Sequence, residues 1–216
     1  MNIVLLGSPA SGKGTQADLL CRKFGLYHLS TGDVSRELSR KDARIKEIVD
    51  SGKLIPQEEM TMHVINFLTK ERPTLKNILF EGFPRFIPQY EALESFMKTN
   101  GDEINIVFSL EVSEKEAIRR ISARRTCQKC GHVYNTITNP PKIADTCDCG
   151  GKLILRDDDK PESVKVRFEY YRENTEKLIN YLDEKGKLVR INGERPVEEI
   201  QKDLVKEIKN LNKQSE

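Results

Sequence analysis

A short segment near the N-terminus carries residue types that bind phosphate. Residues 7–15 read G-S-P-A-S-G-K-G-T and directly follow the apolar run of residues 2–6. A glycine-rich turn after a strand lets successive backbone N–H groups point at one spot, where a helix beginning near Lys13 adds the positive end of its dipole. The ammonium group of Lys13 can then reach the terminal phosphates. The segment therefore predicts a site for a nucleoside triphosphate.

This segment follows the phosphate-loop pattern G-x-x-x-x-G-K-[ST] with one change. Gly7, Gly12 and Lys13 occupy the fixed positions, whereas Gly14 stands at the Ser/Thr position and Thr15 follows it. A glycine-rich turn in some other α/β protein is the alternative. The strand before the loop and the helical period after it are the context that a phosphate loop requires, and they favour phosphate binding.

Composition bounds the class of protein. The chain has 216 residues, 37% of them hydrophobic, which is enough for one core with inserted subdomains. A formal net charge of +2 gives no global field toward nucleic acid, and no run approaches the roughly 18 to 20 apolar residues of a membrane span. No export signal precedes the first strand, so we expect a cytoplasmic protein. In that compartment the five cysteines favour a metal site or free thiols over disulfides.

Short apolar runs alternate with helical periods along the chain. Strands are predicted at residues 2–6, 27–29, 77–80, 104–110 and 188–191. Helices are predicted at residues 13–24, 57–69, 88–97, 114–125, 161–182 and 197–211. This alternation predicts an α/β fold in which a five-stranded parallel sheet is covered by helices and binds ligands at the carboxyl ends of its strands.

Two stretches interrupt the alternation. Residues 30–59 are polar and helical, and residues 126–159 are rich in Cys, Gly, Pro, Thr and Asp. Segments this long inside a compact domain are usually functional lids. We therefore predict a core of residues 1–29, 60–125 and 160–216, with both insertions lying over the binding face.

The second insertion has the cysteine spacing of a metal site. Cys127 and Cys130 form a C-x-x-C pair, and after sixteen residues Cys147 and Cys149 form a C-x-C pair. Four thiolates at this separation favour a structural zinc ribbon, in which the ion's binding free energy folds a loop that lacks a core. The alternatives are four unliganded thiols or a site degraded by one deletion. His132 could replace one sulfur, although a solvent-facing histidine is the more common case.

Arginines stand beside the turns and insertions. Phosphoryl transfer requires alignment of two substrates, exclusion of water and neutralisation of charge, and guanidinium groups bind phosphate bidentately. The arginines in question are Arg36, Arg85, Arg120, Arg124, Arg156 and Arg167. Arg120 and Arg124 are four residues apart on a predicted helix and should share one face. Each arginine alone is most often a solvated surface charge, so the prediction depends on their joint position.

Three motifs together resemble the adenylate kinase family, in its long form with a zinc-type lid. They are the segment 7–16, Ser30-Thr-Gly-Asp33, and Glu81-Gly-Phe-Pro-Arg85-x-x-x-Gln89, and the resemblance extends from Met1 to the last helix. It implies a P-loop NTPase-type sheet, a helical AMP-binding insert and a small zinc-ribbon-like lid. The implied reaction converts ATP and AMP to two ADP, with Mg²⁺ on the triphosphate, in a monomer whose lids close over the substrates.

The resemblance also implies roles for single residues. Around ATP, Lys13 and the loop 7–15 would hold the phosphates, and Arg120 would stack on the adenine. Around AMP, Arg36 and Arg85 would bind the phosphate and Gln89 the adenine. The remaining implied AMP contacts are Thr31, Gly82 and the backbone of residues 54–57.

The same resemblance assigns the reacting centre. Arg124, Arg156 and Arg167 would surround the transferring phosphoryl group, and Asp158 and Asp159 would contact these arginines as the lid closes. The run of acids at 157–159 can also stabilise the N-terminus of the helix predicted from residue 161, and both roles can hold at once.

The chain departs from the family pattern at three places. Glu81 stands where the family usually has the Asp that organises waters around Mg²⁺. Because Glu is one methylene longer, we expect an effect on the metal geometry or the turnover rate rather than on the reaction. Ala10 replaces a common glycine, and its Cβ is expected to fit only if the residue avoids positive φ. One residue is missing between Cys147 and Cys149.

Three other functions remain open. The chain could phosphorylate UMP, CMP or GMP, although Thr31 and Gln89 favour adenine through the resemblance. A nucleotide-regulated zinc-ribbon protein that binds nucleic acid is disfavoured by the acids of the insertion and by its one aromatic residue, Tyr134. An inactive nucleotide binder is suggested only by Glu81. We therefore expect neither a nucleic acid nor a membrane partner.

Overall fold

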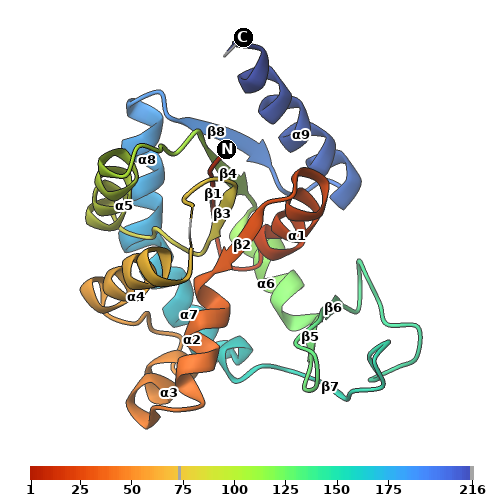
Figure 1. The fold of residues 1–216 in the computed structure, drawn as a ribbon. Coiled ribbons are helices and arrows are strands. Elements are labelled where there is room, and N and C mark those ends of the chain that lie inside the picture. The colour runs from red at the N-terminus through yellow and green to blue at the C-terminus, as the bar shows by residue number, and fades with distance from the viewer. Residues whose placement is uncertain (73, 215–216) are drawn as a thin grey trace.

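The computed structural model describes residues 1–72 and 74–214, with side chains as far as Leu211. Its centre is a five-stranded parallel sheet of strand order β2-β3-β1-β4-β8 (Figure 1). The strands are β1 (Ile3–Gly7), β2 (Tyr27–Ser30), β3 (Ile78–Glu81), β4 (Ile106–Glu111) and β8 (Leu188–Asn192). The predicted α/β class and five-stranded parallel sheet are confirmed, and the strand boundaries differ from the predicted ones by at most two residues.

Both faces of the sheet are buried, which explains the nearly continuous apolar runs of its strands. Side chains alternate between two hydrophobic clusters along each strand, so Val4 packs on one face and Leu5 on the other. The connections reverse direction at β1, because β2 and β3 lie on one side of it and β4 and β8 on the other. In sheets of this type such a reversal creates the crevice where ligands bind.

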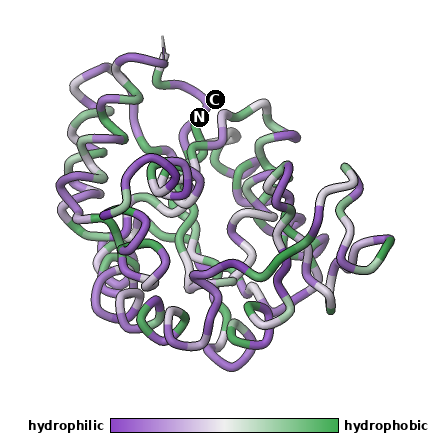
Figure 2. The backbone as a smooth tube through the Cα atoms, turned by 90° about the horizontal axis from the view of Figure 1, so that it is seen from below, coloured by the Kyte–Doolittle hydropathy of each residue, from purple (hydrophilic) through white to green (hydrophobic). Residues whose placement is uncertain are grey.

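Helices cover the two faces unequally. Helices α4 (Gln57–Glu71), α5 (Ile87–Thr99) and α8 (Glu176–Glu184) pack on one face, and α1 (Lys13–Phe24) and α9 (Val197–Gln214) on the other. Along these outer helices hydrophobic and hydrophilic stretches of the backbone tube alternate, as expected for elements buried along one side only (Figure 2). No helix among the described residues is both long and apolar enough to cross a membrane.

The helix predicted at 161–182 has an irregular middle. It consists of α7 (Pro161–Tyr170), a π-helical turn at Tyr171–Thr175, and α8. Wider turns of this kind often lie at functional sites. Here the turn brings the Thr175 hydroxyl within 3.3 Å of the backbone carbonyl of Arg85, to which it donates a hydrogen bond.

The two inserted stretches lie at the same end of the core, to either side of it in the view of Figure 1. The first contains α2 (Thr31–Ser39) and α3 (Ala43–Asp50), capped by the side chains of Ser30 and Asp42. The second contains a three-stranded antiparallel sheet of order β6-β5-β7. Its strands are β5 (Arg124–Cys127), β6 (Val133–Asn135) and β7 (Leu153–Ile154), and the 3₁₀ turn Asp157–Asp159 follows them.

One predicted helix is too long. Helix α6 spans Glu114–Ser122, and Arg124 is the first residue of β5, so Arg120 and Arg124 do not share a helix face. The reason is competition from β6. Asn135 donates a side-chain hydrogen bond of 3.1 Å to the Arg120 carbonyl, and Arg124 pairs with Asn135 across the antiparallel ladder. Backbone groups that would form the next helical hydrogen bonds are thus bonded to β6 instead, and the helix ends.

Candidate functional site

The loop between β1 and α1 forms a cradle closed by Lys13. Its ammonium group donates to the carbonyls of Gly7 at 2.8 Å and Ser8 at 2.7 Å. Gly7 has φ 144°, and a Cβ there would lie 2.5 Å from the Leu110 carbonyl oxygen, so only glycine fits. The predicted helix start at Lys13 is confirmed. The cradle therefore stands at the carboxyl end of the central strand, at the point where the topology reverses.

Ala10 adopts φ 56°, so its Cβ is accommodated at positive φ, contrary to the condition expected for it. A residue with a Cβ pays about 1 to 2 kcal/mol for the left-handed conformation. The methyl group packs against a small cluster of Ala117, Ile121, Val164 and Phe168. This burial offsets part of the conformational cost and ties the loop to α6 and α7.

Buried cations converge on the cradle from separate elements. Burial lowers the pKa of Lys13 to about 7, and the charges of Arg85, Arg124 and Arg167 act in the same direction, whereas Glu81 raises it. Burial likewise lowers the pKa of Arg85 to about 10 and that of Arg156 to about 10. Cations so crowded and so poorly hydrated are stabilised by a bound anion.

Two aspartates hold part of this cluster in place. The Asp159 side chain is fully buried and accepts from Arg124 Nε at 2.7 Å and from Arg167 Nη1 at 2.8 Å. Asp158 accepts from Arg167 at 3.1 Å, whereas the exposed Asp157 pairs with Lys160 at 2.7 Å. The 3₁₀ turn thus anchors two arginines as well as preceding the N-terminus of α7.

Arg156 and Arg36 flank the cluster. Arg156 Nε donates to the Thr126 hydroxyl at 2.8 Å, and Arg36 forms an ion pair of 2.5 Å with Asp33. Arg36 contributes to the lowered pKa of both Arg85 and Arg156, so its charge reaches the same space. Arginines from both inserted stretches therefore face a single region, together with those of the core.

The turn after β3 connects the remaining predicted residues. Thr31 Oγ1 and Arg85 Nε both donate to the Gly82 carbonyl at 2.7 Å, and Gly82 has φ 76°. Gln89 is buried, with its side-chain oxygen accepting from the Arg85 N–H at 2.9 Å and its amide donating to the Gln57 carbonyl at 3.1 Å. Gln89 thus joins the arginine turn to the start of α4.

Glu81 lies at the carboxyl end of β3 and is held by the neighbouring strand. Ser30 is its register partner in β2 and donates a hydrogen bond of 2.9 Å to Oε2. His28 Nε2 lies 3.9 Å from the same oxygen. The carboxylate thus faces Lys13 from a fixed direction and offers the oxygen chemistry that Mg²⁺ and its waters prefer.

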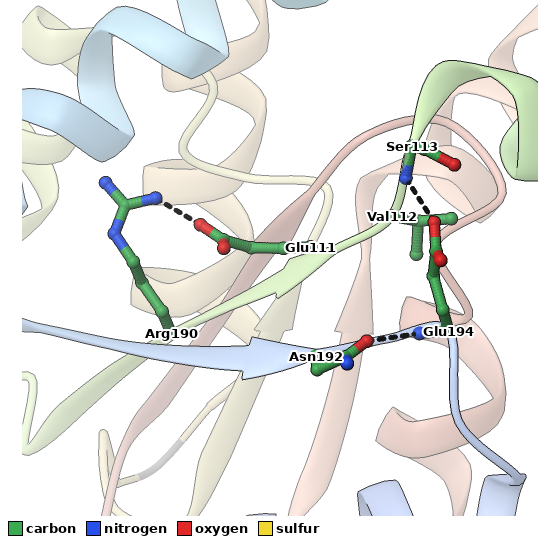
Figure 3. Close-up of a pocket in the computed structure, with 6 residues that line it drawn as sticks. All are labelled: Glu111, Val112, Ser113, Arg190, Asn192 and Glu194. Carbon is green, nitrogen blue, oxygen red and sulfur yellow. Dashed lines mark hydrogen bonds and ion pairs between the residues drawn. The ribbon is translucent and has the colours of Figure 1, made fainter.

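Arg120 lies apart from the buried cluster, on α6. A shallow hollow of about 380 Å³ opens at the carboxyl ends of β4 and β8, lined by Glu111, Val112, Ser113, Arg190, Asn192 and Glu194 (Figure 3). Its walls are cross-linked, because Arg190 pairs with Glu111 and the Ser113 N–H donates to Glu194 at 2.8 Å. Arg120 contributes to the lowered pKa of Glu194, so the guanidinium is on this side of α6.

The four cysteines of the small sheet form one cluster. Their Sγ atoms all lie within 4.8 Å of one another, and the closest pair, Cys130 and Cys149, is 3.4 Å apart. A tetrahedral zinc ion with Zn–S bonds of about 2.3 Å places its sulfurs about 3.8 Å apart, so the donor set suits zinc. Backbone N–H donation from Cys149 lowers the pKa of Cys147 to about 6, which favours the thiolate that a metal binds.

Two neighbours complete this cluster. A Cβ on Gly151 would lie 2.5 Å from Cys127 Sγ, so this glycine allows the C-x-C pair to approach the first pair. The His132 backbone carbonyl accepts from the Cys127 N–H, and the group of potential metal ligands among the described residues contains cysteines alone. Tyr134 is buried against Cys147 and is not available for stacking on a nucleic acid base.

Sequence reasoning missed the residues that orient the functional side chains. Ser30 holds Glu81, Thr126 holds Arg156, and Glu116 accepts from Arg120 Nε at 2.7 Å. The spacing of Glu116 and Arg120, four residues apart on a helix, is the one signal that could have indicated such a pair. Ser30 and Glu81 lie on neighbouring strands, and Thr126 of β5 meets Arg156 in the segment after β7, so residue types alone do not show these two pairs.

The sheet topology, the glycine-rich loop after β1 and the converging cations are those of a P-loop protein fold with two insertions. A family model described as adenylate kinase matches residues 5–187. The chain belongs to the adenylate kinase family of enzymes, which perform nucleotide phosphoryl transfer.

Several relatives named adenylate kinase match over nearly the whole chain. One from Lachnospira eligens is 40% identical over 211 residues, covering 95% of this chain and 99% of the relative. One from Archaeoglobus fulgidus is 40% identical over 209 residues, covering 94% and 96%. A third from Kosmotoga olearia is 38% identical over 216 residues, covering 98% and 100%. The similarity therefore includes both inserted stretches as well as the core.

Proposed function

We propose that the protein transfers a phosphoryl group reversibly from Mg²⁺-bound ATP to AMP and releases two ADP. The observation that carries this proposal is the convergence of Lys13 with Arg85, Arg124 and Arg167 at the carboxyl ends of the strands. A protein that binds a single nucleotide needs only one group of phosphate-binding cations. Cations that arrive from the phosphate loop, from the turn after β3, from β5 and from α7 suit two phosphate chains placed end to end.

On the donor side, Lys13 and the loop of Gly7, Gly12, Gly14 and Thr15 hold the phosphates of ATP, and Arg120 stacks on its adenine. When bound, Mg²⁺ neutralises charge on the triphosphate, and Glu81 is placed to orient its waters. The hydrogen bond from Ser30 supports this role. It holds the Glu81 carboxylate, which is one methylene longer than that of Asp, at the carboxyl end of the strands.

On the acceptor side, Arg36 and Arg85 bind the AMP phosphate, with Thr31 and Gly82 beside them. Gln89 reads the adenine, and the backbone of residues 54–57 lines the base pocket. The hydrogen bonds of Gln89 to Arg85 and Gln57 support this assignment, since they give the side-chain amide one orientation next to both groups.

The reaction needs positioning and electrostatics rather than a general base. Arg124, Arg156 and Arg167 surround the transferring group, and Asp158 and Asp159 orient these arginines. Fixed cations in a site without water stabilise the charge on the equatorial oxygens of the phosphoryl group and cost no reorganisation as it moves.

The two insertions act as lids over a core of residues 1–29, 60–125 and 160–216. Residues 30–59 close over AMP and residues 126–159 over ATP, which keeps the phosphoryl group from being hydrolysed. Cys127, Cys130, Cys147 and Cys149 hold a structural zinc ion that folds the second lid. We expect a cytoplasmic monomer without nucleic acid or membrane partners.

An enzyme-coupled assay of ADP tests this function. ATP, AMP and Mg²⁺ together should yield two ADP per AMP consumed, with loss of turnover when Mg²⁺ is omitted. UMP, CMP and GMP should be much poorer acceptors. Faster turnover with any of these three would reassign the acceptor, and ATP consumption without an acceptor would replace the kinase proposal with hydrolysis.

A further inference from the structure

Glu116 holds two consecutive arginines on α6. Its Oε1 accepts from Arg120 Nε at 2.7 Å and from Arg119 Nη2 at 2.8 Å, while Oε2 accepts from Arg119 Nε at 2.7 Å. The Arg119 side chain is 48% exposed, whereas those of Arg120 and Glu116 are 15% and 19% exposed. The exposed Arg119 thus holds the Glu116 carboxylate, and the carboxylate in turn holds the less exposed Arg120.

These contacts leave Arg120 with one orientation. Among the described residues, the hydrogen bonds of its guanidinium involve Nε alone, so the two Nη groups make no hydrogen bond to the protein. Asn135 of β6 binds the Arg120 carbonyl at 3.1 Å and fixes the backbone as well. An arginine ordered before binding loses less side-chain entropy when a ligand stacks on it.

The charge of Glu116 persists at every physiological pH. Hydrogen bonds from Arg119 and then Arg120 lower the pKa of Glu116 to about 2, against the effect of partial burial. Glu194, in the turn after β8, has its pKa lowered in part by the charge of Arg120, but among the described residues its carboxylate accepts from the Ser113 N–H and not from Arg120. Glu116 is therefore the acid that sets the guanidinium plane.

We propose that Glu116 is a positioning residue that preorients the guanidinium of Arg120 for the base of the donor nucleotide. The inference rests on the proposed function, in which Arg120 stacks on the adenine of ATP. It adds a residue that never touches ATP but selects which orientation of Arg120 meets the base. Its effect is confined to the donor, because none of its contacts joins the acceptor side.

Steady-state kinetics with each nucleotide varied in turn tests this role. Glu116→Ala should raise KM for ATP about three- to tenfold and leave KM for AMP unchanged. Glu116→Gln keeps an oxygen that can accept from Nε and should give an intermediate value. The Ki of tripolyphosphate, a competitor that fills the phosphate cradle without a base, should be the same in all three proteins.

Glu114→Ala is the matched control. Glu114 lies in the same first turn of α6 and pairs with the exposed Arg172 at 2.8 Å, so its removal costs the same helix-terminal charge without touching Arg120. It should leave both KM values unchanged. Thermal unfolding of each variant checks that α6 stays folded, and the Gln variant provides the same comparison if the Ala variant does not fold.

Arg120→Ala separates the inference from the function on which it rests. A raised KM for ATP in Arg120→Ala combined with an unchanged KM in Glu116→Ala would overturn the positioning role and leave the proposed function intact. An unchanged KM in Arg120→Ala would remove the assigned role of Arg120 and the inference with it. Equal rises for ATP, AMP and tripolyphosphate would make Glu116 a purely structural residue.

Discussion

Lys13 combines an unfavourable environment with a functional contact. Its ammonium group is buried beside three arginines, yet it makes two hydrogen bonds to backbone carbonyls of its own loop. In the proposed mechanism the carbonyls keep the cation in place until phosphate oxygens replace them. Because burial, with the charges of the nearby arginines, lowers its pKa to about 7, a bound phosphate chain would stabilise the charged form and be stabilised by it.

We predict that Lys13→Met lowers kcat/KM by about 10²- to 10³-fold while the fold persists, because one preorganised cation is lost from the reacting centre. Initial rates of ADP formation and the far-UV circular dichroism spectrum measure the two parts. Lys23→Met, on the exposed side of the same helix, is the control and should retain full activity. Near-normal turnover of Lys13→Met would contradict the cradle.

Asp159 and Asp157 are neighbours with different surroundings, which allows a matched comparison. Asp159→Asn leaves the guanidinium groups of Arg124 and Arg167 without their buried counter-ion and should lower the free energy of unfolding by about 3 to 5 kcal/mol at pH 7. Asp157→Asn removes an exposed pair and should change it by less than about 1 kcal/mol. Urea titrations measure both values.

The pH dependence of this comparison follows from the pKa of Asp159. Burial raises that pKa, but the contacts with Arg124 dominate and hold it below its ordinary value of 3.8. A lowered pKa means that the stabilisation is present above pH 3.8 and is lost as the pH falls through the folded-state value. A difference between the two variants that disappears already at pH 6 would be inconsistent with this account.

For single residues, the sequence predicted which side chains the candidate site contains better than it predicted their hydrogen-bond partners. Local spacing identified the loop around Lys13, since such motifs depend on consecutive residues. The positive φ of Ala10 was not predictable, because the compensating contacts come from α6 and α7. The same holds for Ser30, whose hydrogen bond to Glu81 depends on the register of two strands far apart in the chain.

Among the elements, the end of α6 shows where periodicity fails. The residues up to Arg125 continue a helical pattern, yet pairing with β6 draws Arg124 into a strand. The π-helical turn before α8 is similar, because the hydrogen bond from Thr175 to the Arg85 carbonyl requires a turn from another part of the chain. Helix α1, whose backbone hydrogen bonds are local, was predicted to the residue, and β1 was predicted to within one residue.

The cysteine cluster offers a test at the same scale. Gly151→Ala places a methyl group 2.5 Å from Cys127 Sγ and should reduce the zinc bound per chain, because the two pairs can no longer close around one ion. Elemental analysis of the purified protein measures the metal content. Lys152→Ala, which changes the next residue of the same exposed segment, should bind zinc fully. Equal zinc content in both variants would argue against a four-cysteine site.

In the whole molecule, the proposed substrate contacts lie at one edge of the sheet, the edge formed by the carboxyl ends of the strands. Parallel strands end together there, and both insertions leave the core at that end (Figure 1). Composition and alternation predicted this architecture because they reflect burial along the entire chain. The proposed closure of the insertions depends on bound substrates, which no sequence pattern encodes.

The central claim is that one chamber of cations holds two nucleotides by their phosphates. Calorimetric titration with a bisubstrate dinucleoside pentaphosphate tests it most directly. We predict saturable binding of one molecule per chain, displaced by either ATP or AMP and strongly weakened by Lys13→Met. Absence of saturable binding, or displacement by only one of the two nucleotides, would contradict the claim.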